Sequence, residues 1–321
     1  MYDVAALGEL LIDFTPSGTN DQGIALFGRN PGGAPANVLA MMRKLGSEQV
    51  AFIGKVGSDG FGQFLQKTLT NVGIDVTGLI LDPQYLTTLA FVQLSDTGDR
   101  SFSFYRREGA DLMLRWDEIR KELIDNAKIF HFGSVSLSGE PCRGTVAKTV
   151  DYAKSKGKVI SYDPNYRPFL WSSEAEAKVE IGKFLTSADI LKVSEEEMTL
   201  LTGETDLAKG ADKLAVQGAA VVLVSLGADG AYYRCADGAG KLSTYDVKTI
   251  DTTGAGDAFL GAVLYQLKDK SRAQLEAITK GELAAIVDFA NAAGSLTTTK
   301  KGAIPALPSL AEIVSCQKSK H

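Results

Sequence analysis

The chain of 321 residues carries a formal net charge of −5, with 45% hydrophobic and 23% charged residues. This balance predicts a folded acidic protein and gives no sign of a basic nucleic-acid surface or a polybasic membrane patch. Three cysteines without CxxC spacing argue against a disulfide framework or a zinc cluster. No run of about 18 uncharged apolar residues indicates a membrane helix, so we expect a cytoplasmic protein with no membrane or nucleic-acid partner.

Short apolar runs alternate with helix-like segments along most of the chain. The first run, at residues 2–12, contains Asp3 and Glu9 and predicts an opening β-strand rather than a signal peptide. The βαβα order indicates a mostly parallel central sheet with helices on both faces, a three-layer α/β/α fold. Further strands are predicted at 50–56, 129–132, 159–162, 190–193 and 221–226, and helices at 35–45, 61–72, 116–126, 145–156, 174–185, 207–217, 258–267 and 281–298.

The chain holds only two histidines, so histidine triads and metal sites are poor candidates. His131 lies in the apolar run at 129–132, which is typical of a buried strand. We therefore expect His131 to have a core role.

Residues 87–106 interrupt the alternation. Two alternating runs flank a turn at residues 96–99, which predicts a β-hairpin, and Phe102, Phe104 and Arg106 share one strand face by the period of two. Because two strands are not stable alone, we expect them to join the polar segment at 15–30 in a small antiparallel sheet. The prediction is a single domain with lid segments inserted at about residues 14–31 and 86–108.

The most informative stretch is Asp-Thr-Thr-Gly-Ala-Gly-Asp at residues 251–257. Gly254, Ala255 and Gly256 precede an apolar run with helical spacing, so their backbone N–H groups and the helix dipole can bind the oxygens of a phosphoryl group. Asp257, in the first helical turn, can accept the proton of an attacking hydroxyl. The alternative is an ordinary helix N-terminus with Asp257 as its cap.

A second glycine-rich stretch, Asn-Pro-Gly-Gly-Ala-Pro-Ala-Asn, occupies residues 30–37 ahead of a predicted helix. Gly32 and Gly33 permit close backbone approach, and Asn37 offers both a donor and an acceptor. This combination suits a polyhydroxylated ligand. The alternative is a plain Pro/Gly loop before a helix.

Taken together, the two stretches resemble both signatures of the PfkB (ribokinase-like) carbohydrate kinases, in the right order and over essentially the whole chain. The resemblance implies a ribokinase-like fold and transfer of the γ-phosphoryl group of ATP, with Mg²⁺, to a sugar hydroxyl. It makes Asp257 the general base and the backbone at Gly254–Gly256 the anion hole. In this family the lid often forms a homodimer, which we expect here by analogy.

Within the family, the details resemble fructokinases. Residues 8–14, Gly-Glu-Leu-Leu-Ile-Asp-Phe, are similar to their opening strand, in which Asp13 would bind sugar hydroxyls. Residues 162–171 resemble an Asp-Pro-Asn-x-Arg segment shared with 2-keto-3-deoxygluconate kinases, and residues 130–137 with 140–143 look specifically fructokinase-like. The resemblance places four further residues near the sugar or the lid: Phe104, Arg106, Asn165 and Arg167. Asn165 could instead be an ordinary turn residue.

The nucleotide side carries weaker motifs. The segment from Lys192 to Glu197 resembles a family region whose glutamate organises Mg²⁺-bound water, although Ser194 stands where asparagine is usual. An acidic first helical turn would also explain Glu197. By resemblance, further nucleotide-binding residues are Ser225, Gly227, Gly230, Asn291 and Gly294. Family members often bind K⁺ near residues 301–303, with Asp251 as the matching side chain.

The leading hypothesis is an ATP-dependent fructokinase. The open alternatives are a kinase for 2-keto-3-deoxygluconate, ribose or another furanose, and a kinase-like scaffold without catalysis. The Asp13 and Asp-Pro-Asn-x-Arg pattern disfavours ribose, whereas a keto acid should require an extra cation near its carboxylate. A dinucleotide-binding oxidoreductase is rejected because Gly-x-Gly-x-x-Gly is missing after the first strand.

Overall fold

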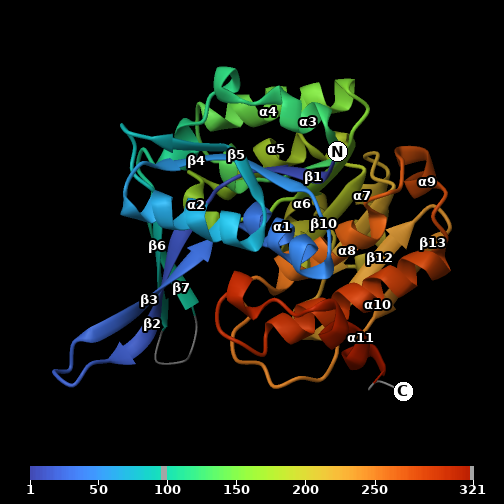
Figure 1. Cartoon of the computed structure of the whole chain (residues 1–321). Helices are drawn as coiled ribbons and strands as arrows, with labels where there is room; N and C mark the ends of the chain where they lie inside the picture. The colour runs from blue at the N-terminus through green and yellow to red at the C-terminus, as the bar shows by residue number, and fades with distance from the viewer. Residues whose placement is uncertain (95–99, 319–321) are drawn as a thin grey trace.

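A mostly parallel sheet forms the centre of the molecule (Figure 1). The computed structural model describes residues 1–94 and 100–318, within which this sheet has nine strands in the order β13-β12-β11-β10-β9-β8-β1-β4-β5. The pairs from β5 to β11 are parallel, and β12 and β13 close one edge antiparallel. The strands are β1 (Tyr2–Leu7), β4 (Val50–Gly57), β5 (Asp75–Asp82), β8 (Ala127–Gly133), β9 (Val159–Asp163), β10 (Ile190–Ser194), β11 (Val221–Ser225), β12 (Ala231–Cys235) and β13 (Gly238–Leu242).

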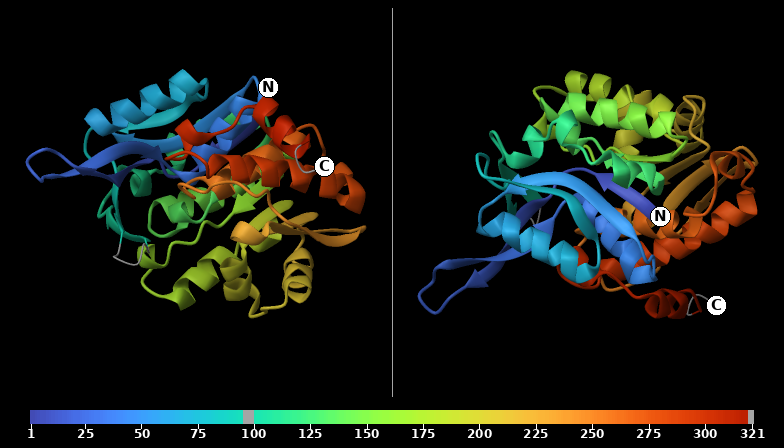
Figure 2. Two further views of the ribbon diagram at one scale, coloured as in Figure 1. Left: turned by 90° about the horizontal axis from the view of Figure 1, so that it is seen from below. Right: turned by 45° about the horizontal axis from the view of Figure 1, so that its top comes forward.

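Helices cover both faces of this sheet, as the alternation predicts (Figure 1, Figure 2). Leu39 and Val287 belong to the apolar core on one face, and Val146 and Leu214 to the core on the other. Strands that are buried on both faces need apolar residues along their length, which explains the short unbroken runs in the sequence. One face carries α1 (Ala34–Leu45), α2 (Gly60–Val72), α8 (Ala255–Leu267) and α10 (Lys280–Thr297); the other carries α3 (Lys121–Asp125), α4 (Cys142–Ser155), α5 (Glu174–Gly182), α6 (Glu195–Thr202) and α7 (Leu207–Ala215).

The predicted core histidine is confirmed. His131 is 1% exposed, and its Nδ1 lies 3.1 Å from Oγ of Ser161 on the neighbouring strand. Burial lowers the pKa of His131 to about 3, so the ring is neutral.

The structure divides the predicted opening strand at residues 2–12 in two. Strand β1 ends at Leu7, and β2 begins at Leu11 in the smaller sheet. Gly8 follows β1 and passes close to Pro35, since a Cβ at Gly8 would lie only 2.3 Å from Cγ of Pro35. The segment predicted as a helix at 116–126 also differs. Ile119 has an extended backbone, which leaves a 3₁₀ turn and the short α3 in its place.

A second, smaller sheet stands beside the first and takes its strands from the two segments predicted for the lid. In the described residues its order is β3-β2-β6-β7, with β2 (Leu11–Thr19), β3 (Ala25–Gly32), β6 (Leu89–Leu94) and β7 (Arg100–Tyr105). Two antiparallel hairpins are joined by parallel pairing of β2 with β6. Figure 2 shows the β2–β3 hairpin projecting from the body. The predicted turn at residues 96–99 lies outside the described residues.

The order of the strands reverses at β1, which lies between β4 and β8. In open α/β sheets, ligands bind outside the carboxyl ends of the strands at such a switch point. Here the segments that follow β8 and β9 meet at this edge, since the N–H of Ser134 donates to the carbonyl of Pro164 at 2.8 Å. The fold therefore points to this edge as the site.

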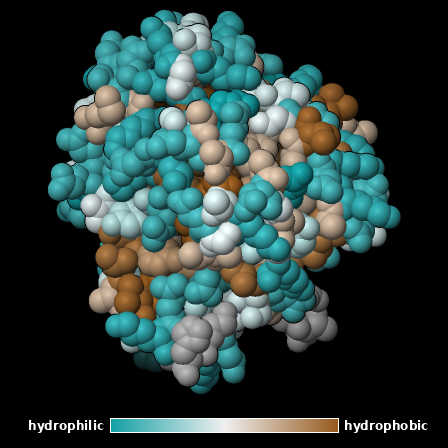
Figure 3. Space-filling model, turned by 90° about the vertical axis from the view of Figure 1, so that its right-hand side faces the viewer, coloured by the Kyte–Doolittle hydropathy of each residue, from teal (hydrophilic) through white to brown (hydrophobic). Residues whose placement is uncertain are grey.

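The surface view of one side is dominated by hydrophilic residues, with apolar ones in small groups between them (Figure 3). Across residues 1–94 and 100–318, no helix combines the length and apolar character that a membrane span requires. The remaining α-helices of the described residues are α9 (Arg272–Glu276) and the C-terminal helix α11 (Leu310–Lys318).

Candidate active site

Two cavities meet at the N-terminus of α8. The larger has a volume of about 640 Å³ and the smaller of about 480 Å³, and Thr252 and Gly256 line both. The five residues predicted for the nucleotide at the ends of β11 and in α10 line the larger cavity: Ser225, Gly227, Gly230, Asn291 and Gly294. The turn at Gly256 is thus placed where a group could pass from one cavity to the other.

Gly254 is the position in this turn that requires glycine. Gly254 has a φ of 76°, and a Cβ at this position would lie 2.6 Å from Cβ of Ala303. A Cβ at Gly256 would lie 3.2 Å from Nζ of Lys192. The N–H groups in the first turn of a helix have no partner within the helix and attract anions. The N–H of Ala255 donates to the carbonyl of Thr252 at 3.3 Å, and the binding of phosphoryl oxygens by this turn stays a prediction.

Asp257 follows in the first turn of α8 and lines the smaller cavity. Its side chain is buried, and its Oδ2 accepts a hydrogen bond from Nδ2 of Asn37 at 2.8 Å. Burial raises the pKa of Asp257, although the Asn37 bond and the charges of Lys192 and Arg167 oppose this. A carboxylate with a raised pKa is a better proton acceptor and can still be ionised near neutral pH.

The smaller cavity collects most of the residues predicted for the sugar. It is lined by Asp13, Gly33, Asn37, Phe104, Asn165 and Arg167, from segments far apart in the chain. Burial raises the pKa of Asp13 to about 7 against the opposing charge of Arg167, while Asp257 adds to the rise. Asn165 has a φ of 50°, a left-handed conformation that asparagine tolerates better than most residues. Carboxylates, amides and a guanidinium on one wall suit a polyhydroxylated ligand.

The paired glycines at residues 32 and 33 have different tasks. A Cβ at Gly32 would lie 2.2 Å from Oδ2 of Asp13, so Gly32 leaves room for that carboxylate without itself lining the cavity. Gly33 has a φ of 126°, and a Cβ there would lie 2.4 Å from the carbonyl oxygen of Glu9. Both positions therefore exclude a side chain, which explains the glycine pair.

Comparison with known proteins identifies the family. The model of the pfkB family carbohydrate kinase matches residues 1–310. The chain belongs to this family. A similar relative is probable fructokinase-2 of Arabidopsis thaliana, which is 44% identical over 98% of this chain and 95% of its own length. The chain is thus a carbohydrate kinase of the PfkB family.

Solved structures agree with this PfkB assignment. The structure is similar to fructokinase with bound ATP from Xylella fastidiosa, with a TM-score of 0.91 and 31% identity over 100% of this chain and 99% of that one. It is also similar to fructokinase from Vibrio cholerae O395 in its fructose, ADP and calcium ion bound form, with a TM-score of 0.86 and 36% identity over 98% of each chain. These neighbours confirm the predicted ribokinase-like α/β fold.

Two residues predicted for the nucleotide side belong to a buried network in this PfkB kinase. Lys192 and Glu197 do not line the larger cavity. Nζ of Lys192 lies 2.9 Å from Oδ2 of Asp163, and Glu197 accepts hydrogen bonds from the N–H groups of Tyr166, at 2.6 Å, and Ser194, at 2.7 Å. Burial alone would lower the pKa of Lys192, but Asp163 and Glu197 raise it. The network lies beside the turn at the start of α8, because Nζ of Lys192 is 3.2 Å from the place that a Cβ of Gly256 would take.

Arg106 also departs from the prediction that it lies at the sugar. It follows the last residue of β7, where the period of two no longer applies, and it does not line the smaller cavity. Its guanidinium forms a buried ion pair with Asp111, with Nε 2.8 Å from Oδ2. Its other donors bind Ser138 and the carbonyl of Val135. In this kinase Arg106 is a structural anchor at the base of the lid.

Sequence reasoning missed several residues that line the smaller cavity, among them Glu9 and Phe169. Glu9 lines the cavity, is 3% exposed, and accepts the N–H of Ala34 at 2.8 Å. The sequence could have indicated Glu9, because a carboxyl group inside an apolar run needs a polar partner when it is buried. Phe169 stacks on Phe104 of the lid with ring centroids 5.2 Å apart, a contact between distant segments that no local pattern indicates.

Asp251 holds the loop before the catalytic turn to the loop after α10. Its Oδ1 accepts hydrogen bonds from the N–H and hydroxyl of Thr253, and its Oδ2 accepts the N–H of Gly302 at 2.9 Å. The predicted K⁺ region is therefore a junction of two backbone segments that Asp251 joins.

Proposed function

We propose that this PfkB kinase is a fructokinase, which transfers the γ-phosphoryl group of ATP to D-fructose and releases ADP and D-fructose 6-phosphate. The observation that carries the proposal is the position of Gly256, which lines both cavities, with Asp257 on the side of the smaller one. ATP in the larger cavity would extend its phosphates to the turn. A sugar hydroxyl in the smaller cavity would then give its proton to Asp257 as it attacks the phosphorus.

The charges of the smaller cavity support a neutral sugar over a keto acid. Among the described residues that line it, Arg167 is the one permanent cation, because Arg106 is paired with Asp111 elsewhere. Three carboxyl groups, those of Glu9, Asp13 and Asp257, also line it. A substrate carboxylate would find one cation among three carboxyl groups here, whereas hydroxyl groups can donate to the carboxyl oxygens. This favours fructose over 2-keto-3-deoxygluconate.

Mg²⁺ fits the donors of the site as a metal bound mainly through phosphate and water. The described residues contain no cluster of three side chains that could hold a metal, and kinases bind Mg²⁺ through one or two carboxylates and the phosphates. Glu197, whose two oxygens already accept backbone N–H groups, would reach the ion through water. When bound, the ion would neutralise charge that develops on the phosphoryl oxygens.

Two further proposals concern K⁺ and assembly. K⁺ would bind backbone carbonyls of the loops that Asp251 joins, and activity in K⁺ compared with Na⁺ buffer tests this.

The lid exposes Ile24, Leu26 and Phe27, which are 57%, 44% and 45% exposed, and their burial in a homodimer is supported by the cost of leaving apolar surface in water. Light scattering of the purified protein measures the assembly.

The experiment that tests the proposed function is a comparison of kcat/KM for D-fructose, ribose, 2-keto-3-deoxygluconate, adenosine and tagatose 6-phosphate. A coupled assay of ADP release with ATP and Mg²⁺ in excess gives all five values. Fructose should give the highest kcat/KM, and any other acceptor ranking above it would overturn the assignment.

A further inference from the structure

Two neighbouring loops form one wall of the smaller cavity, which is the proposed sugar site and is called the sugar cavity below. The loop after β8, residues 134–138, contributes Val135, and the loop after β9, residues 164–173, contributes Arg167 and Phe169 among others. The loops share a backbone bond where they leave the sheet, from Ser134 to Pro164. At their far ends the two loops have left the sheet, so contacts between side chains set the distance between these ends.

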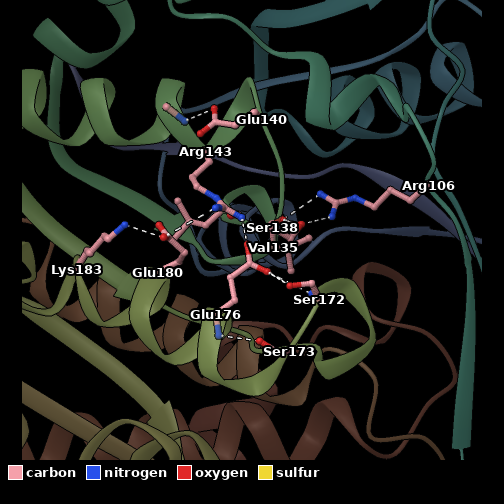
Figure 4. Close-up of polar contacts among 12 residues, drawn as sticks. Arg106, Val135, Ser138, Glu140, Arg143, Ser172, Ser173, Glu176, Glu180 and Lys183 are labelled. Carbon is pink, nitrogen blue, oxygen red and sulfur yellow. Dashed lines mark hydrogen bonds and ion pairs between the residues drawn. The ribbon is translucent and has the colours of Figure 1, made fainter.

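Arg143, in the first turn of α4, joins these far ends (Figure 4). Its Nε donates to the carbonyl oxygen of Leu137 at 2.6 Å, at the end of the first loop. Its Nη2 donates to Oε1 of Glu176 in α5 at 2.8 Å, and its guanidinium carbon lies 5.9 Å from the ring centroid of Trp171 in the second loop. One planar guanidinium thus contacts the end of the first loop directly and the helix that follows the second loop through Glu176.

Glu176 extends this contact to the second loop. Its Oε2 accepts hydrogen bonds from the N–H of Ser172, at 3.3 Å, and from the Ser172 hydroxyl. Ser172 comes three residues after Phe169, so the carboxylate fixes the point where the loop enters α5. The Arg143–Glu176 pair therefore ties the end of one loop to the end of the other.

The first loop is held from its opposite side by Arg106. Nη2 of Arg106 donates to the carbonyl of Val135 at 3.0 Å, and Nη1 to Oγ of Ser138 at 2.6 Å (Figure 4). The loop that carries Val135 is thus fixed between two arginines. Arg106 connects it to the lid, and Arg143 connects it to the loop that carries Arg167.

We propose that Arg143 is a positioning residue of the sugar site, which holds the two loops at the separation that places Val135, Arg167 and Phe169 around the acceptor. Its role is not mainly stability. The side chains of Arg143 and Glu176 are 22% and 31% exposed, and ion pairs open to solvent contribute roughly 0–1 kcal/mol. A small displacement of a positioning group, in contrast, can cost catalysis about 100-fold. The identity of the acceptor rests on the function proposed above.

The test uses Arg143→Ala, Arg143→Lys and Glu176→Gln in the full chain, with kcat and KM measured separately for the sugar and for ATP. We expect Arg143→Ala to lower kcat/KM for the sugar by about tenfold or more, with KM for ATP within about twofold and Tm within a few degrees. Arg143→Lys should recover only part of the kcat/KM for the sugar that Arg143→Ala loses, because an ammonium lacks the planar fork that binds two acceptors at fixed angles.

Two control variants separate positioning from general loss of charge. Lys183→Ala removes a partner of Glu180 in the same cluster, and its side chain is 57% exposed. Arg234→Ala removes an arginine of β12 that is paired with Asp212 of α7. Both should behave as wild type. An unchanged sugar kcat/KM in Arg143→Ala, or an equal loss for sugar and ATP accompanied by a lower Tm, would overturn the proposal.

Failure of the proposed function can be distinguished from failure of this inference. Sugar binding is also followed through Trp171 fluorescence in a Trp116→Phe background, which leaves one tryptophan in the chain and does not depend on turnover. If wild type prefers another sugar, the fructokinase proposal fails, and the same variants are tested with that sugar. Weaker binding in Arg143→Ala and Glu176→Gln, with a non-additive double variant, supports the inference; additive losses contradict it.

Discussion

Nδ2 of Asn37 donates a hydrogen bond to Oδ2 of Asp257 at 2.8 Å, although 220 residues separate the two in the chain. The contact follows from the packing of α1 on α8. Gly261 of α8 lies so close to α1 that a Cβ there would be 2.6 Å from Cβ of Met41. The two glycine-rich stretches that stand out in the sequence are therefore halves of one site, in which the sugar-side amide orients the carboxylate at the phosphoryl turn.

Replacing Asp257 tests its role as general base. Asp257→Asn keeps the size of the side chain but cannot accept a proton, so kcat should fall by about 100- to 10,000-fold. Binding of ATP, measured by calorimetry, should change little, because Asp257 lines the smaller cavity and not the larger one. Turnover near wild type in an ADP-release assay would show that another group takes the proton.

Removing the amide of Asn37 should change the pH dependence of the reaction. The hydrogen bond from Asn37 lowers the pKa of Asp257 against the effect of burial, so Asn37→Ala should raise that pKa further. A base is active only when deprotonated, and the acid limb of kcat/KM against pH should therefore move to higher pH. Asn126→Ala, which removes a helix-end amide of α3, is the control. An acid limb that stays in place or moves down would contradict the coupling.

The sequence predicts the scaffold and the turn well because these depend on local patterns. The helix start at Gly254–Asp257 and the glycine pair at residues 32 and 33 require backbone conformations or close approaches that few other residues permit. Strands β5, β12 and β13 of the main sheet were missed. Strands β12 and β13 are short, and their register depends on β11 and on each other rather than on their own pattern.

Side-chain direction is the part that local patterns could not determine. The resemblance of residues 192–197 to a family motif predicts a carboxylate near the nucleotide at Glu197, but the direction of this side chain depends on Tyr166, which comes from the preceding βα unit. Arg106 was assigned to the face of Phe104 by the period of two, and its ion pair with Asp111 overrides that period. Both residues satisfy buried partners that only the folded chain brings near.

Replacing Arg106 distinguishes an anchor from a sugar ligand. The side chains of Arg106 and Asp111 are 5% and 1% exposed, and removal of one partner of a buried pair costs about 3–5 kcal/mol because the other charge is left unpaired. Arg106→Ala should lower the free energy of unfolding in urea by about this amount. Arg167→Ala, in the cavity wall, should instead raise the KM for the sugar with Tm within a few degrees. If Arg106→Ala is as stable as wild type, the role of Arg106 as an anchor is contradicted, and Arg106 is again a candidate sugar ligand.

Glu9 should make the stability of the protein depend on pH. Burial raises the pKa of Glu9 from 4.5 to about 7, so between these values the folded protein binds a proton that the unfolded chain has lost. Stability from this group is present below pH 4.5 and is lost as the pH rises through 7. Glu9→Gln does not titrate, and its stability relative to wild type should rise between pH 5 and pH 8 by up to about 3 kcal/mol, at 1.36 kcal/mol per pKa unit.

Urea denaturation at several pH values measures this difference, and any constant cost of the buried amide cancels in the comparison across pH. Glu312→Gln is the matched control. The N–H of Ser309 and its hydroxyl lower the pKa of Glu312 to about 2, so Glu312 is ionised in both the folded and the unfolded state from pH 5 to 8. Its effect on stability should be flat in that range. If the Glu9→Gln difference is equally flat, the Glu9 carboxyl is ionised in the folded protein throughout, and the sugar cavity carries one more negative charge than its burial implies.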